Sequence, residues 1–166
     1  QPVKPRVVAV LDIGKTNLKI CLMDAQTGAL LNVAKRCNQV IDAPPYPHVD
    51  EQTMWTWIKN QLKSFASQYY VLSISITTHG ATVACMSGNE LALPILDYEY
   101  DGVAEFNQEY DVLRPKFKET YSPNLPQGLN LGRQLFWQAQ RFPELFKKVD
   151  CLLLYPQYWG FKLSGS

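Results

Sequence analysis

The chain has 166 residues, of which 46% are hydrophobic and 19% charged, and its formal net charge is +1. This length corresponds to about one domain and is enough to bury a sizeable core. Sixteen basic and 15 acidic residues nearly balance and form no basic run, so we expect no nucleic-acid partner. No apolar run approaches the ~20 residues of a membrane span, and we expect no membrane association.

The cysteines favour a reducing compartment. Four of them are scattered without CxxC spacing: Cys21, Cys37, Cys85 and Cys151. Each lies in an apolar or strand-like run, so we expect buried free thiols and a cytoplasmic protein rather than disulfides or zinc.

One stretch near the start of the chain combines a buried strand with groups that bind phosphate. Val7–Lys19 reads VVAVLDIGKTNLK, in which an apolar strand ends at Asp12 and leads into a turn that contains Gly14 and Thr16. Mg²⁺ prefers oxygen ligands and often uses one or two carboxylates. Turn N–H groups and a threonine hydroxyl can hold phosphate oxygens, and glycine lets the backbone approach a ligand. The stretch predicts a magnesium and phosphate site, but the same residues also suit an ordinary hairpin turn.

The first half of the chain predicts a mixed α/β sheet that opens with three antiparallel strands. The strand Val7–Asp12 is nearly all apolar and should be covered on both faces. The runs Leu18–Asp24 and Ala29–Cys37 follow it as further strands, joined by a turn. Three prolines make Asn38–Asp50 a loop.

A helix and a fourth strand come next. Asp50 is a candidate N-cap for a helix over Glu51–Tyr69. Its expected apolar face consists of Trp55, Ile58, Leu62, Phe65 and Ala66. The alternating run Val71–Thr77 is a strand, and TTHGAT at its carboxyl end lies where open α/β sheets bind ligands.

The second half is less regular. Val83–Met86 predicts a short strand, and Pro94 demotes the returning run Leu91–Leu96 to an edge or irregular strand. A short helix is expected around Leu113–Thr120 and a buried strand over Cys151–Tyr155. A longer helix is expected over Leu131–Arg141, with Leu135, Phe136 and Ala139 pointing inward.

Four stretches, in this order, resemble the amino-terminal domain of the FGGY family of carbohydrate kinases. They are LDIGKTNLK, the strand into TTHGAT, LALPILDYEYDG, and the final segment with PELF, CLLLY and PQYWGFKLSG. The resemblance implies a ribonuclease-H-like, actin-like ATPase fold with helices on the faces of a mixed sheet. It also implies transfer of the γ-phosphoryl group of ATP to a hydroxyl of a ketose or polyol, with ATP and Mg²⁺ as cofactors.

The resemblance assigns roles residue by residue. Asp12 would hold Mg²⁺ near the β- and γ-phosphates. The phosphate-binding residues would be Gly14, Lys15, Thr16, Asn17 and Lys19. The carbohydrate-binding residues would be His79, Gly80, Ala81, Asp97 and Glu99. The partners implied are a small sugar or polyol and ATP, and the family pattern allows a homodimer.

Two features depart from the family pattern. Asp97–Tyr100 reads DYEY where many members have Trp, Asn or Gln, and Asp. The family's general base lies beyond Ser166, as does its adenine-binding domain. Residues 1–166 therefore predict one ribonuclease-H-like sugar-kinase domain, incomplete at its carboxyl end and inactive in isolation. The alternatives are a non-catalytic ligand-binding module of the actin-like superfamily and a ribonuclease-H-like nuclease.

Overall fold

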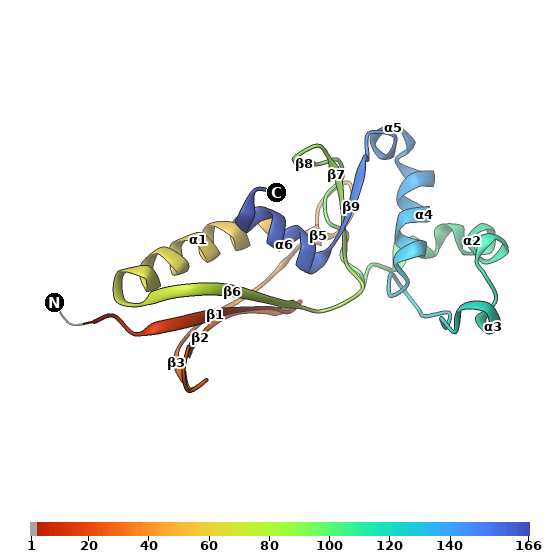
Figure 1. Ribbon diagram of the computed structural model, residues 1–166. Helices are drawn as coiled ribbons and strands as arrows, with labels where there is room; N and C mark the ends of the chain where they lie inside the picture. The colour runs from red at the N-terminus through yellow and green to blue at the C-terminus, as the bar shows by residue number, and fades with distance from the viewer. Residues whose placement is uncertain (1–2) are drawn as a thin grey trace. The chain divides into compact units, whose positions relative to one another are not determined.

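The computed structural model describes residues 3–166, which divide into two compact units (Figure 1). The first unit contains the residues up to Gln39 together with Asp50–His79 and Trp159–Ser166. The second contains Val40–Val49 and Gly80–Tyr158. Among the described residues, no helix has the length and apolar character needed to cross a membrane.

A four-stranded mixed sheet forms the first unit. Its strands are β1 (Arg6–Ile13), β2 (Asn17–Asp24), β3 (Leu30–Cys37) and β6 (Tyr70–Thr78), in the order β3-β2-β1-β6. The pairs β1–β2 and β2–β3 are antiparallel, whereas β1 and β6 are parallel. This arrangement confirms the expected opening with three antiparallel strands and a fourth strand after a helix.

Only one face of this sheet has the burial of a core. The fully buried residues on it are Val7, Ala9, Leu11 and Ile13 of β1 and Leu18, Ile20 and Leu22 of β2. The helix α1 (Glu51–Gln68) lies along the sheet (Figure 1) and buries Met54, Ile58 and Phe65. The intervening residues Val8 and Val10 are half-buried. The expectation that β1 is covered on both faces is therefore wrong for the described unit.

The helix α1 begins where its cap residue predicts. The Asp50 carboxylate accepts a hydrogen bond from the Thr53 backbone N–H, and the helix ends at Gln68. Its apolar face differs in part from the expectation, because Ala66 is exposed and Met54 is buried. The buried stripe Met54, Ile58 and Phe65 still has the spacing of one helix face.

Short strands organise the second unit. The strand β7 (Val83–Ser87) pairs with β8 (Glu90–Leu91) and β9 (Cys151–Leu154), both antiparallel. The segment expected to be a plain loop contains a small ladder, β4 (Val40–Ile41) with β5 (His48–Val49). The expectation of a buried β9 is wrong, since three of its four residues are exposed.

Along the chain, the helices η1 to α5 of the second unit come after β8 and before β9. They are η1 (Asp101–Phe106), α2 (Asn107–Leu113), α3 (Phe117–Thr120), α4 (Leu131–Arg141) and α5 (Pro143–Phe146). The single helix expected around Leu113–Thr120 is wrong, because α2 ends before Pro115 and α3 begins after it. The last helix, α6 (Tyr155–Ser164), begins in this unit and ends in the first.

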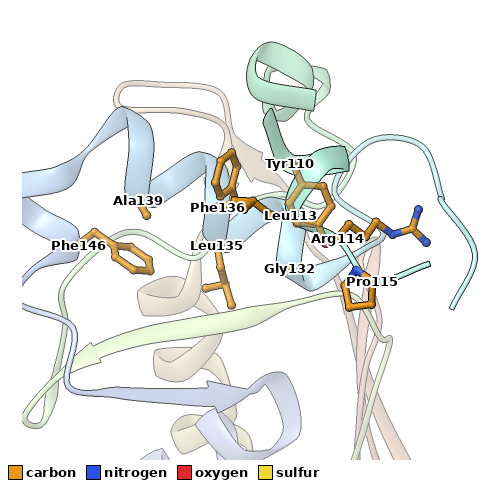
Figure 2. A pocket seen from close by; sticks show the side chains of 9 residues that line it. All are labelled: Tyr110, Leu113, Arg114, Pro115, Gly132, Leu135, Phe136, Ala139 and Phe146. Atoms are coloured by element: carbon orange, nitrogen blue, oxygen red, sulfur yellow. The ribbon is translucent and has the colours of Figure 1, made fainter. Parts of the chain in front are cut away.

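Helix α4 has the expected bounds but buries a different face. Its buried residues are Arg133, Gln134, Trp137 and Gln138, three of them polar. Leu135, Phe136 and Ala139, expected to point inward, are half-buried and line an apolar pocket of about 370 Å³ between α2, α4 and α5 (Figure 2). In that pocket Phe136 faces Tyr110 with ring centroids 5.7 Å apart. The buried side of α4 instead packs on an aromatic cluster that includes Tyr46, Leu96 and Val103.

The four cysteines are free, but their surroundings differ. Cys85 is buried and Cys21 half-buried, whereas Cys37 and Cys151 are exposed, so the expectation of buried thiols is wrong for the last two. Both exposed cysteines lie on strands with several other exposed residues. Burial raises the pKa of the Cys85 thiol to about 11.

Removing the cap of α1 should destabilise the first unit. We expect Asp50→Ala to lower the free energy of unfolding by about 1 kcal/mol, because the Thr53 N–H loses its acceptor and the helix N-terminus loses a negative charge. Urea denaturation followed by circular dichroism measures the change. The control is Asp42→Ala, which removes the same charge from an exposed loop. Equal losses in the two variants would contradict the capping role.

The thiols should react in the order of their exposure. At pH 8 we expect a disulfide reagent such as DTNB to modify Cys37 and Cys151 in the folded protein but to spare Cys85. With a pKa of about 11, only about a thousandth of the Cys85 thiol is ionised at that pH, and burial also blocks access. Mass spectrometry of the labelled peptides identifies the sites, and denaturant should release the reactivity of Cys85. Modification of Cys85 at the rate of Cys37 in folded protein would contradict the buried position.

Candidate functional site

The predicted magnesium ligand Asp12 lies near the end of the central strand of the first sheet. In the ladder with β2 it is directly opposite Lys19, and in the ladder with β6 it is opposite Thr77. Paired residues of adjacent strands share a face, so these three side chains lie together. The Lys19 ammonium is 3.2 Å from the Asp12 carboxylate, and the two side chains are 39% and 43% exposed. The site is thus accessible to solvent and already holds one charge of each sign.

A tight turn joins β1 to β2 beside this ion pair. The Gly14 N–H donates to the Asn17 carbonyl at 2.9 Å, and a Cβ on Gly14 would come within 3.1 Å of that oxygen. Glycine is therefore the residue that fits this turn most easily. The Asn17 side chain donates to the Thr16 hydroxyl at 3.1 Å, and Thr16 itself is exposed.

Asn38 fixes the turn from the end of β3. Its side-chain amide donates to the Gly14 carbonyl at 3.0 Å, and its backbone N–H donates to the Thr16 carbonyl at 2.9 Å. Its side-chain oxygen is buried without a hydrogen-bond partner among the described residues. Asn38 thus holds the Gly14 and Thr16 carbonyls and fixes the shape of the turn.

The structure brings His79 to the same end of the sheet. The His79 N–H donates to the Ile13 carbonyl at 3.1 Å, which extends the parallel ladder of β1 and β6 by one residue. The Thr78 hydroxyl donates to the His79 carbonyl at 2.8 Å. His79 is half-buried and lies next to the residue that precedes Gly14. A predicted carbohydrate residue and the predicted phosphate turn therefore adjoin within one unit.

The fit of a magnesium ion rests on one carboxylate. Asp12 is solvent-accessible, and Mg²⁺ bound with a nucleotide commonly keeps several waters and takes one or two protein carboxylates. A single accessible carboxylate beside a hydroxyl-bearing turn fits that chemistry. Within residues 3–166 no three His, Cys, Asp or Glu side chains gather as a metal site. A two-metal nuclease needs several converging carboxylates, so the geometry does not favour that alternative.

The remaining carbohydrate candidates lie in the second unit. Gly80 and Ala81 follow His79, and Ala81 adopts a left-handed backbone conformation with φ of 58°. Asp97 begins a turn in which its carboxylate accepts from the Glu99 N–H at 3.2 Å and its carbonyl accepts from the Tyr100 N–H at 3.0 Å. Asp97 is half-buried and Glu99 exposed. The Asp97 carboxylate thus has a structural task in its own turn, whatever it binds.

Three residues of these sites lie outside the sequence motifs. Asn38 adjoins the predicted phosphate turn, and Gly128 and Gln134 contact the loops of Ala81 and Asp97. Asn38 comes directly after a predicted strand, and Gly128 lies in a turn region. These positions could have indicated that the two residues hold the backbone in place. Gln134 lies on the side of α4 that we expected to face outward. Because the wrong face was expected to be buried, Gln134 was not a candidate.

Two pockets of the described residues lie away from these site residues. The apolar pocket beside α4 in the second unit contains none of the predicted site residues (Figure 2). A more polar pocket of about 450 Å³ lies beside the first turns of α1 in the first unit. Its lining residues are Arg36, Gln52, Thr53, Thr56, Trp57 and Asn60. The site residues are therefore placed by strand ends and turns rather than by either pocket.

Solved structures of carbohydrate kinases resemble the chain over almost its whole length. A carbohydrate kinase from Novosphingobium aromaticivorans is 32% identical, with a TM-score of 0.88 over 98% of this chain and 34% of that one. A ligand-bound xylulose kinase from Lactobacillus acidophilus is 14% identical, with a TM-score of 0.80 over 97% of this chain and 34% of that one. Glycerol kinase from Plasmodium falciparum with ADP is also 14% identical, with a TM-score of 0.73 over 98% and 35%.

The chain spans about a third of the length of these kinases. No protein-family model and no curated protein sequence matches it. The two more distant structures share its fold, the actin-like ATPase fold of the sugar kinases. With the 32% identity to the first kinase, they show that the chain is similar in sequence and fold to carbohydrate kinases.

Proposed function

We propose that the complete protein is an ATP-dependent kinase that phosphorylates a hydroxyl of a ketose or polyol. The observation that carries the proposal is the end of the first sheet, where Asp12, the Gly14–Asn17 turn, Lys19 and His79 adjoin. It lies in a chain 32% identical to a carbohydrate kinase.

Phosphoryl transfer depends mainly on positioning and on neutralising the negative charge of the phosphates. Asp12 would hold Mg²⁺, which supplies positive charge to the phosphate oxygens when bound. Lys15 and Lys19 would add cationic groups, and the Thr16 hydroxyl would donate to a phosphate oxygen. Gly14 and Asn17 keep the turn in shape through the hydrogen bond between them.

The carbohydrate would bind to residues that follow the end of β6. We assign it to His79, Gly80, Ala81, Asp97 and Glu99, since carboxylates and imidazoles accept hydrogen bonds from hydroxyl groups. The turn of Asp97 is held in place by the hydrogen bonds that its carboxylate and carbonyl accept from the Glu99 and Tyr100 N–H groups. Because this turn differs from the usual family residues, the panel of sugars tested below includes both ketoses and polyols.

We further propose that residues 1–166 form the amino-terminal domain and do not turn over alone. The general base and the adenine-binding domain would come from other parts of the protein, in line with the length of the structural neighbours. Four free cysteines support a cytoplasmic location, and a homodimer is the assembly that we propose to test first.

The proposal is tested by ATP-dependent phosphorylation of a panel of ketoses and polyols by the complete protein. We expect turnover with at least one member, and we expect Asp12→Asn to lower kcat/KM by at least about a hundredfold because the magnesium ligand is lost. Asp42→Asn, in an exposed loop, should keep full activity. Unaltered melting temperatures show that both variants fold.

Near-normal activity of Asp12→Asn would remove the magnesium assignment. Absence of phosphorylation across the panel by the folded wild-type protein would instead count against the kinase itself.

The two lysines opposite each other on β2 and β3 offer a matched test of the phosphate site. Lys19 contacts Asp12, whereas Lys35, its partner in the ladder, is exposed. We expect Lys19→Met to raise the KM for ATP about fivefold through loss of a positive charge beside the phosphates. Lys35→Met should leave the KM for ATP unchanged. Steady-state kinetics with varied ATP measure both, and equal effects would show that only the net charge of the sheet matters.

A further inference from the structure

Helix α4 carries two buried carboxamides one helical turn apart. Gln134 is 0% and Gln138 1% exposed. Buried polar side chains normally form hydrogen bonds, and each one without a full set of partners requires a reason. The two glutamines form hydrogen bonds with different sets of partners, and this difference indicates different roles.

Gln138 belongs to a closed network in the core. Its amide donates to the Tyr46 hydroxyl at 2.9 Å, and its carbonyl accepts from the Cys85 thiol at 3.7 Å. The Tyr46 hydroxyl in turn donates to the Pro94 carbonyl at 2.7 Å. Every partner lies within the core of the second unit.

Gln134 instead connects two surface loops. Its amide nitrogen donates to the Ala81 carbonyl at 2.7 Å and also to the Gly128 carbonyl. Because both neighbours are backbone carbonyls, which only accept, the nitrogen and not the oxygen of the side chain must face them. Its own carbonyl oxygen is buried without a partner among the described residues.

The second loop continues from Gly128 to the turn of Asp97. The Gly128 N–H donates to the Tyr98 carbonyl at 2.8 Å. A Cβ on Gly128 would lie 3.0 Å from both that carbonyl oxygen and the Gln134 Cγ, so a side chain here would push them apart. One short chain of hydrogen bonds thus joins Ala81, Gln134, Gly128 and Tyr98.

We propose that Gln134 is a positioning residue for the carbohydrate site. The inference rests on the proposed kinase function. Gln134 fixes the backbone of Gly80–Ala81 relative to the turn that holds Asp97 and Glu99, so that the carbohydrate contacts of this unit keep one geometry. Ala81 is held in the left-handed region, which is unfavourable for a residue with a Cβ. The hydrogen bond from Gln134 to its carbonyl helps to hold it there.

The two hydrogen bonds that Gln134 donates account for a buried glutamine at this position. An apolar side chain of similar size would fill the space without leaving a buried acceptor unsatisfied. The two donated hydrogen bonds are what an apolar side chain would lose, and both fix loop backbone.

The test compares Gln134→Met with Gln138→Met in the complete protein. Both replace a buried glutamine of α4 by a thioether of similar volume. We expect Gln134→Met to raise the KM for the carbohydrate about tenfold, since a small misplacement of binding groups is costly, with the KM for ATP within about twofold of wild type. We expect the two variants to lower the melting temperature by similar amounts. Gln138→Met, however, should leave both KM values unchanged.

Backbone hydrogen exchange supplies a readout that does not need catalysis. In Gln134→Met we expect faster exchange in peptides that cover Gly80–Thr82, Asp97–Tyr100 and Gly128, whereas Gln138→Met should leave these peptides unchanged. Gly128→Ala provides a second route to the same effect, because its methyl group presses on Gln134 and the Tyr98 carbonyl.

The outcomes separate the two proposals. An active wild-type enzyme in which the two methionine variants have equal carbohydrate KM values overturns the positioning role, as does equal exchange in the three peptides. A wild-type protein without kinase activity overturns the proposed function. In that case faster exchange confined to Gln134→Met and Gly128→Ala still supports the link between the loops, and its absence overturns the link.

Discussion

The pairing of β1 on both of its edges is the constraint on which the first unit depends. Its antiparallel ladder with β2 places Lys19 opposite Asp12, and its parallel ladder with β6 places Thr77 there as well. Since a shift of one residue would move every side chain to the other face, the buried row from Val7 to Ile13 fixes this register. The apolar side of the sheet therefore determines which polar groups meet at its end, and the His79 N–H extends the same ladder.

In the second unit the comparable constraint comes from buried polar side chains. Helix α4 places Arg133, Gln134 and Gln138 on its buried side, where each donates to backbone or side-chain oxygens of other segments. The unit has only short strands, so ladders hold little of its backbone. Hydrogen bonds from a buried helix face can organise loops that no sheet organises, at the cost of desolvating the donors. This explains why Leu135, Phe136 and Ala139 lie on the half-buried side of α4.

The sequence predicted correctly those elements whose apolar pattern matches the burial of their residues in the fold. The strands β1, β2 and β6 and the Asp50 cap follow from apolar runs and local capping chemistry, which depend on neighbouring residues alone. The face of α4 was predicted wrongly, because Leu135 and Phe136 are apolar while three of the four residues that the fold buries are polar. Their hydrogen-bond partners are backbone carbonyls and side-chain groups outside the helix, and no periodic pattern in the helix reveals such partners. For the same reason the sequence did not indicate Asn38 and Gln134, whereas the strand-end motif indicated Asp12 as a candidate.

The strength of the Asp12–Lys19 pair decides whether this strand end can serve a nucleotide. With side chains 43% and 39% exposed, the pair contributes about 0–1 kcal/mol, as exposed ion pairs do. A fully buried pair would cost several kcal/mol to open, because a lone charge would remain in the core. The accessible pair instead keeps the Asp12 carboxylate compensated beside apolar neighbours and separates easily when other charges arrive. If the proposed Mg²⁺ were bound, the Asp12 carboxylate would be its ligand and the Lys19 ammonium would be available to a phosphate. The proposed roles of these two residues would then need no change in the strands that hold them.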